Sequence, residues 1–409
     1  MLESSGVMLR IKLMFALALL LAAASVACTG EPGYRVAQID GVTIVENLDD
    51  GAWAGRADAF RLVLEQTYGA DEYPEEAVLG NGLVLRFAAN RSGEVYVQDG
   101  QVGRLVKFRR DGSVAWTAGR PGPAPGEFHA VTGVELAPDE ETVIVSNFAG
   151  RLDYWSADGE LVETVTMDPE RGLPGALQGF AGEMAVFSQG LERRLGARVV
   201  IARPDDLLSS LTFDVDVAPE VESGFARQVP IAPYAGGIAA GSNASYELRF
   251  YTTEGELVRR VTRDVPYPVR PGYSRDDRGR GARHDFGSVG APMALLGGYF
   301  MVIASWEAGV TDPDATAAER GLEMGWASAE NWRMSFDLFD AEGRFLQSIV
   351  PRGPLEVLGP RAYPVELGWP RQTTGAAPGE TPYLFTLAID PFPQIRRYRI
   401  ELTPPPGRR

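Results

Sequence analysis

A hairpin pattern that recurs about every 47 residues is the feature that most limits how this chain can fold. Its two clearest turns are Asp111-Gly112 and Asp158-Gly159, which lie 47 residues apart. Each turn joins two runs in which apolar and polar residues alternate, as they do in half-buried strands. Asp-Gly is a strong hairpin signal because both residues tolerate the positive φ that a tight turn requires. The pattern therefore predicts antiparallel meanders.

Four further copies of this pattern follow. Glu254-Gly255 and Glu342-Gly343 occupy turns of the same kind, and the 96 residues between Asp158 and Glu254 are twice a repeat length. A degenerate copy is therefore expected between them, at 199–205. The last copy covers 383–400, which brings the count to six.

Six units of three or four strands each are typical of a β-propeller, in which sheets pack radially around a ring. We therefore predict an all-β, six-bladed β-propeller over residues 60–403, followed by a short tail at 404–409. One such sheet cannot bury both faces alone, so the units are stable only together. Residues 60–65 alternate apolar and polar without a hairpin partner nearby. We predict that they form the outer strand of the last blade, which would protect an open edge.

Residues 1–27 have the organisation of a secretory signal peptide. Arg10 and Lys12 precede an apolar run at 13–21 and then small residues up to Ala27, which are the charged, apolar and cleavage regions of such a signal. The apolar run is too short for a transmembrane helix, which needs about 20 residues. Residues 28–59 show little periodicity, and we expect them to form a tether that spaces the folded body from the membrane.

Cys28 is the only cysteine of the chain, so no intrachain disulfide can form. The segment 24–28, Ala-Ser-Val-Ala-Cys, resembles a bacterial lipobox, in which the thiol is lipidated and the chain is cut before the cysteine. Ser25 departs from the Leu that is usual at its position. The resemblance implies a lipid anchor at Cys28, and Thr29 in place of Asp favours the outer membrane, facing the periplasm. The alternative is an ordinary signal cut near Ala27, with Cys28 incidental.

The net charge argues against nucleic acid as a partner. Asp and Glu number 55 against 39 Lys and Arg, which gives a net charge of −16. A surface this acidic repels phosphate backbones. We expect instead an unidentified partner protein or small-molecule ligand, and contact with a membrane through the lipid anchor.

The segment Gly119–Phe128 has the sequence Gly-Arg-Pro-Gly-Pro-Ala-Pro-Gly-Glu-Phe and resembles the connection between blades in six-bladed NHL-type propellers. Val95-Tyr96-Val97 and Arg104–Phe108 are similar to core strands of that family, many of whose members are bacterial lipoproteins by sequence. The resemblance covers about 60–168 and is weaker beyond. We interpret the segment as a compact crossover with few hydrogen bonds, not as a catalytic motif.

Two kinds of metal site known from similar propellers can be tested against the residues. NHL-type lyases hold zinc with several histidines, but this chain has only His129 and His284, and catalytic zinc usually has three protein ligands. Calcium-dependent lactonase propellers use oxygen ligands, which Asp99, Glu127 and Asn147 could supply. Asp99 and Asn147 also occupy equivalent positions after a strand, where turn residues are common. We therefore expect no metal or cofactor and assign no catalytic residue.

Two long departures from the repeat are the best candidates for a binding surface, because loops on a rigid framework often carry function. Residues 263–290 interleave arginines with aspartates, and residues 310–332 are expected to hold a short helix that starts near Asp314. The candidate binding residues are Arg275, Arg278, Arg280, Arg283, His284 and Trp326. The alternative is that both insertions are flexible solvated loops.

These features together predict an exported, lipid-anchored propeller that binds a ligand or a partner protein in the bacterial cell envelope. A second hypothesis is a propeller hydrolase or lyase, similar to the lactonases, that uses a divalent cation at the mouth of the channel. A third is a structural surface scaffold without a ligand.

Overall fold

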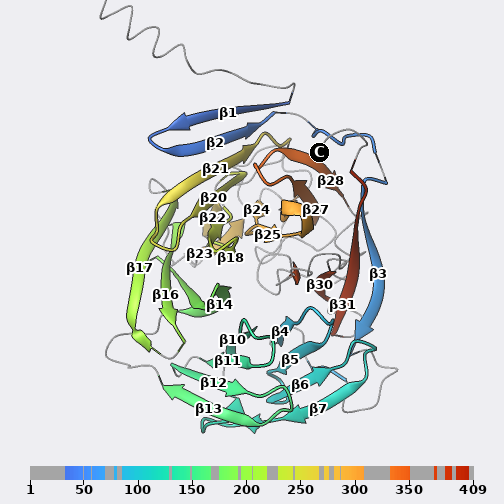
Figure 1. The fold of residues 1–409 in the computed structure, drawn as a ribbon, viewed down its shortest axis with the longest axis vertical. Coiled ribbons are helices and arrows are strands. Elements are labelled where there is room, and N and C mark those ends of the chain that lie inside the picture. The colour runs from blue at the N-terminus through green and yellow to red at the C-terminus, as the bar shows by residue number, and fades with distance from the viewer. Residues whose placement is uncertain are drawn as a thin grey trace, which may run out of the picture.

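The computed structural model contains six sheets of four or more strands that follow one another around a ring, so the chain is an all-β, six-bladed β-propeller (Figure 1). We number the blades 1 to 6 in chain order, beginning with the sheet that starts at Leu85. The structure describes residues 33–48, 50–56, 58–69, 78–80, 85–128, 131–147, 150–166, 175–191, 195–204, 206–218, 229–242, 245–266, 271–275, 281–285, 287–307, 332–350, 373–374, 383–388 and 393–404.

Blades 1 to 3 are four-stranded antiparallel meanders. Blade 1 consists of β4 (Leu85–Ala89), β5 (Val95–Asp99), β6 (Arg104–Phe108) and β7 (Val114–Ala118). Blade 2 consists of β10 (Val131–Leu136), β11 (Val143–Asn147), β12 (Arg151–Trp155) and β13 (Leu161–Thr166). Blade 3 consists of β14 (Ala176–Ala181), β15 (Met184–Gly190), β16 (Leu195–Arg203) and β17 (Asp206–Ala218).

Blades 4 and 5 depart from this plan by added strands, and blade 6 takes its fourth strand from the start of the folded body. Blade 4 contains β18 (Ile231–Tyr234), β19 (Gly237–Ala240), β20 (Glu247–Tyr251) and β21 (Leu257–Arg263). Blade 5 contains β24 (Gly287–Val289), β25 (Met293–Ala294), β26 (Phe300–Glu307), β27 (Trp332–Phe339) and β28 (Phe345–Ile349), with a 3₁₀ turn at Leu296–Gly298. Blade 6 contains β29 (Thr373–Thr374), β30 (Tyr383–Ala388), β31 (Gln394–Leu402) and β3 (Phe60–Tyr68).

The six predicted repeat copies lie in six successive blades, including the degenerate copy at 199–205 in blade 3. The predicted closure of the ring is also confirmed. β3, from the start of the folded body, pairs antiparallel with β31 from Phe60↔Leu402 to Tyr68↔Ile395. The first and last parts of the propeller therefore share one sheet, which removes the open edge.

The expectation that residues 28–59 form only a tether is wrong for 34–47, which contain two strands. β1 (Tyr34–Ile39) and β2 (Val42–Asn47) form a hairpin, and β2 pairs parallel with β21 from Thr43↔Arg259 to Asn47↔Arg263. This N-terminal hairpin extends blade 4 to six strands and lies outside the ring (Figure 1). The chain then crosses blade 5, where Trp53 N–H donates to the carbonyl of Leu346 at 2.8 Å.

The core consists of six clusters of buried side chains, and each cluster is shared by two neighbouring blades. The alternation of side chains along a strand explains this arrangement. In β5, Val95 and Val97 pack toward blade 6, whereas Tyr96 packs toward blade 2. Both faces of a blade are therefore buried only when both of its neighbours are present.

The glycine-rich crossover between blades 1 and 2 is compact, as expected, but it is not poor in hydrogen bonds. β8 (Arg120–Pro121) and β9 (Glu127–Phe128) form a short parallel pair. Buried Arg151, at the start of β12, donates to the carbonyls of Pro123 and Glu127 and forms an ion pair with Asp153 at 3.0 Å. The prolines of the crossover have no N–H to donate, and Arg151, a side chain of the next blade, supplies donors to two of the crossover's carbonyls.

Phe60, in β3, provides a test of how much the closure stabilises the ring. Its side chain is 1% exposed in the core between blades 5 and 6. We expect Phe60→Ala to lower the free energy of unfolding by about 3 to 5 kcal/mol, because it removes buried contacts and leaves a cavity. The measurement is urea denaturation. Leu64→Ala is the control on the same strand, where Leu64 is 51% exposed and should change stability by less than about 0.5 kcal/mol. Equal losses would contradict this role of the closing strand.

Candidate functional site

The connections between strands divide the ring into two faces. Successive connections of an antiparallel meander alternate between the two ends of its sheet. We call the face that carries the connections between first and second strands, and between third and fourth strands, the turn face. The loop face carries the connections between second and third strands and the crossovers between blades.

Both long departures from the repeat leave the ring at the loop face. The first follows β21 and returns at β24, and the second runs from the end of β26 at Glu307 to the start of β27 at Trp332. They belong to blades 4 and 5, which are neighbours. The structure narrows the first departure to 264–286, because Arg263 is the last residue of β21 and 287–289 form β24.

Part of the first departure has regular backbone structure. β22 (Pro271–Arg275) and β23 (Gly281–Asp285) form a separate antiparallel hairpin. In its register Arg275 lies opposite Gly281, Arg283 opposite Tyr273, and His284 opposite Gly272. The side chains of Arg275, Arg283 and His284 lie outside the described part of the structure.

Other residues that the sequence singled out also lie outside the described residues. They are Cys28, His129, Arg278, Arg280, Trp326 and the expected helix near Asp314.

A buried ionic cluster fixes the base of the first departure to blade 5. Arg263 Nη1 donates to Asp337 Oδ2 at 2.7 Å and to Ser348 Oγ at 3.2 Å. The hydroxyls of Tyr246 and Ser348 also donate to the Asp337 carboxylate, which is fully buried. The Arg263 guanidinium lies 3.7 Å from the ring centroid of Phe345, a cation–π contact. We call these five residues the blade 4–5 junction.

The junction was not predicted as a site. Arg263 was assigned to the insertion, although its contacts are those of a framework residue. Asp337 stands between Phe336 and Leu338 in a central strand, and a charge in such an apolar run is the one available signal. A buried carboxylate needs a paired charge or several hydrogen-bond donors, but the sequence does not show that the partner is Arg263, 74 residues away.

A second ion-pair group lies at the same end of blade 4. Arg260 donates to both carboxylate oxygens of Glu247 at 2.9 and 3.0 Å, and Arg249 donates to the same carboxylate. Burial acts to raise the pKa of Glu247, but the hydrogen bonds from Arg260 and Arg249 outweigh it and hold this pKa below its ordinary value. The carboxylate is therefore ionised in the folded protein at neutral pH.

Each blade carries a buried polar side chain toward the loop-face end of its second strand. The six residues are Gln98, Ser146, Ser188, Ser242, Ser305 and Thr386, each exposed by 1% or less. Within the described part of the chain, Gln98 Oε1 and Ser305 Oγ have no hydrogen-bond partner. These six side chains form a buried polar layer beneath the loop face, at the ends of second strands that are otherwise apolar.

The three calcium candidates do not form a site. Asp99 accepts hydrogen bonds from the N–H groups of Gly80 and Gln101 at 2.9 and 3.2 Å, so its oxygens hold a turn. Glu127 pairs with Arg120 at 2.7 Å in the crossover. Asn147 ends β11, where its carbonyl accepts from Gly150 N–H at 3.2 Å. Among the described residues, no three His, Cys, Asp or Glu side chains converge as metal ligands.

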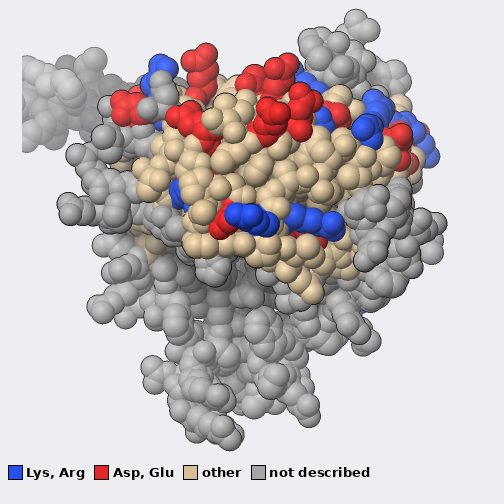
Figure 2. Space-filling view, turned by 90° about the horizontal axis from the view of Figure 1, so that it is seen from below, with Lys and Arg blue, Asp and Glu red and all other residues tan. Residues whose placement is uncertain are grey.

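The surface charge is uneven around the ring. Acidic side chains gather along one rim of blades 1 and 2, on the edge opposite the N-terminal hairpin (Figure 2). The acidic residues of the turn-face connections and of β13 in these blades are Glu94, Asp111, Asp139, Glu140, Glu141, Asp158, Glu160 and Glu163. Arg109 and Arg110 are the exposed basic residues beside Asp111.

Comparisons with known proteins show low similarity. No protein-family profile matches the chain, and no curated protein matches it. A DUF4221 family member from Bacteroides vulgatus shares 13% identity at a TM-score of 0.49, covering 85% of this chain and 99% of its own. A proposed exported protein from Bacteroides fragilis shares 10% at 0.44, covering 88% and 100%. A streptogramin B lyase shares 11% at 0.40, covering 84% and 98%. Similarity at this level transfers no activity to this chain.

Among the described residues, no helix has the length and apolar character to cross a bilayer.

Glu247 provides a test of the electrostatics of blade 4. Because its folded-state pKa is below the ordinary value of 4.5, its stabilisation is complete above that value and is lost as the pH falls through the folded-state pKa. We expect Glu247→Gln to lower the free energy of unfolding by roughly 2 kcal/mol at neutral pH, because it leaves Arg249 and Arg260 without their counter-charge.

This difference from the unaltered protein should shrink as the pH is lowered from about 6 to about 3. Urea denaturation across that range measures it. Glu254→Gln, in an exposed turn of the same blade, should stay within about 0.5 kcal/mol of the unaltered protein. A loss for Glu247→Gln that does not depend on pH would show that the ion pairs are not its cause.

Proposed function

We propose that this protein is an exported, lipid-anchored propeller of the bacterial cell envelope that binds a ligand or a partner protein through the loop face of blades 4 and 5. The supporting observation is the position of the two departures from the repeat, which leave neighbouring blades at the same face. Binding residues lie disproportionately on loops that a rigid framework positions, and here the strands supply that framework.

The blade 4–5 junction supports this assignment on physical grounds. A binding loop holds its ligand best when its base is rigid, since less conformational entropy is then lost on binding. The chain enters the first departure directly after Arg263, whose side chain is held by Asp337 and Ser348 of blade 5. The framework beneath the proposed surface therefore has few ways to rearrange.

Removal of the β22–β23 hairpin tests the binding proposal. We expect replacement of residues 271–285 by a short Gly-Ser connection to abolish capture of envelope components that the unaltered protein retains, because the hairpin belongs to the proposed surface. The readout is quantitative mass spectrometry of material crosslinked to purified protein. The melting temperature should not change, because the hairpin forms a sheet separate from the blades. Unchanged capture would count against the loop face, and Glu254→Gln on the turn face is the matched control.

Export and anchoring rest on the sequence before the folded body. The charged, apolar and small-residue regions of 1–27 fit a signal peptide, and the single cysteine stands directly after them. A lipid on the Cys28 thiol would hold the protein at a membrane, with each buried methylene contributing about 0.8 kcal/mol. Retention on the outer membrane, facing the periplasm, is the arrangement we propose.

Cys28→Ser tests the anchor. We expect the unaltered protein to sediment with membranes and to yield an N-terminal peptide that begins at Cys28 and carries acyl chains. The Cys28→Ser variant should leave the membrane fraction, because no thiol remains to be acylated. Fractionation followed by mass spectrometry of the mature N-terminus makes both measurements. An unmodified terminus on the unaltered protein would refute lipidation, whether the cut precedes Cys28 or lies elsewhere.

A further inference from the structure

We infer that the propeller stands on edge at the bilayer, with the N-terminal hairpin of blade 4 facing the lipid and blades 1 and 2 pointing away from it. The inference rests on the proposed lipidation of Cys28. It goes beyond the anchor by assigning which surface of the ring meets the membrane.

The length of chain between the anchor and the ring limits how far the hairpin can be from the lipid. Only residues 29–32 separate Cys28 from Gly33. An extended chain spans at most about 3.6 Å per residue, so Gly33 lies within roughly 18 Å of a lipidated Cys28. A tether reaching to residue 59, as the sequence alone indicated, would allow several times that distance.

Gly33 is fixed to the N-terminal hairpin, so it does not lengthen the tether. Its carbonyl accepts a hydrogen bond from Leu48 N–H at 2.8 Å, which closes the open end of the β1–β2 hairpin. β2 is in turn paired along its length with β21. The chain therefore reaches the propeller at the outer edge of blade 4.

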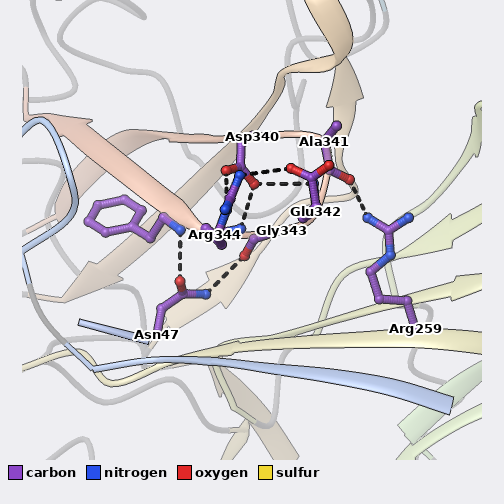
Figure 3. A network of polar contacts seen from close by, with 8 residues as sticks. Asn47, Arg259, Asp340, Ala341, Glu342, Gly343 and Arg344 are labelled. Atoms are coloured by element: carbon purple, nitrogen blue, oxygen red, sulfur yellow. Dashed lines mark hydrogen bonds and ion pairs between the residues drawn. The ribbon is translucent and has the colours of Figure 1, made fainter. Parts of the chain in front are cut away.

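Asn47 fastens this hairpin to blades 4 and 5, and Figure 3 shows its contacts with blade 5. Its amide Nδ2 donates to the carbonyls of Thr262 in blade 4 and Gly343 in blade 5, each at 3.1 Å. Its Oδ1 accepts from Phe345 N–H at 2.7 Å. Asn47 is 2% exposed, so peeling the hairpin from the ring would leave these buried polar groups unpaired, which is costly.

The surface charge then favours one of the orientations of the ring that a short tether permits. The opposite edge of the ring carries the acidic rim of blades 1 and 2 (Figure 2), which a membrane containing anionic lipids repels at close range. The hairpin and β21 carry no net charge toward the lipid, because Arg35 and Arg259 balance Asp40 and Glu46, while Arg260 and Arg263 are paired with Glu247 and Asp337. A ring lying flat on its turn face would bring the acidic rim to the lipid, and one lying flat on its loop face would cover the proposed binding surface, whereas a ring on edge avoids both. Both the turn face and the loop face then remain accessible.

Energy transfer to the bilayer tests this orientation, using lipidated protein in vesicles of phosphatidylethanolamine and phosphatidylglycerol with a headgroup-labelled acceptor lipid. Because Cys28 is the only cysteine and is consumed by the lipid, an introduced cysteine gives one labelling site. Gln38→Cys places a donor on exposed β1, and Val162→Cys places one on β13, where Val162 is 67% exposed. We expect transfer from position 38 to be several-fold greater than from position 162.

A matched variant lengthens the tether. Inserting a Gly/Ser linker of about 25 residues, with a root-mean-square length of roughly 28 Å, between Pro32 and Gly33 should reduce the difference between the two positions. Equal transfer from both positions, with acylated protein still bound to vesicles, would overturn the orientation and leave the anchor intact. A terminus without acyl chains, or protein that does not float with vesicles, would overturn the anchor and the orientation together.

Discussion

The contact on which this ring most depends is the docking of a turn on the outer strand of the preceding blade, which occurs in blades 2, 4 and 5. A Cβ at Gly159 of blade 2 would lie 2.7 Å from Trp116 of blade 1, and one at Gly255 of blade 4 would lie 2.7 Å from Phe213 of blade 3. Gly343 of blade 5 approaches Val261 of blade 4 in the same way, at 2.5 Å. Any side chain at these positions would push two blades apart. The glycines also have positive φ, between 84° and 91°, so one residue serves both the hairpin and the interface.

The two ends of the described chain complete the same contact where the ring closes. No hairpin turn connects the third and fourth strands of blade 6, because β31 and β3 come from opposite ends of the folded body. The segment before β3 takes the place of that turn on blade 5. Gly51 packs against the Leu346 carbonyl, and Trp53 is buried beside Tyr299. Residues of the segment 28–59, which the sequence predicts to be a tether, therefore hold blades 4, 5 and 6 together.

The blades could be predicted from the sequence, but the contacts between distant segments could not. Alternation and acidic-residue–Gly turns are local signals, so the blades and the closing strand could be found from them. The N-terminal hairpin carries the same signal, Asp40-Gly41 between two alternating runs, and could have been predicted as a hairpin. Its parallel pairing with β21 could not, because contacts between segments more than 200 residues apart leave no local pattern. The blade 4–5 junction, which joins Arg263 and Asp337 across 74 residues, also leaves no local pattern, since the isolated charge of Asp337 does not indicate its partners.

The docking of turns also explains why the candidate surface lies at the loop face. In blades 1 to 5, no connection on the turn face is longer than the six residues from 137 to 142. Longer turns there would separate the glycine contacts that hold neighbouring blades. Where the structure describes them, connections on the loop face show no glycine contact that repeats from blade to blade, and these connections range in length from the short turn after Asp99 to the departures at 264–286 and 308–331. Residues can be inserted at the loop face without separating the blades. A binding surface therefore lowers the stability of the ring least at this face, where blades 4 and 5 carry their long departures.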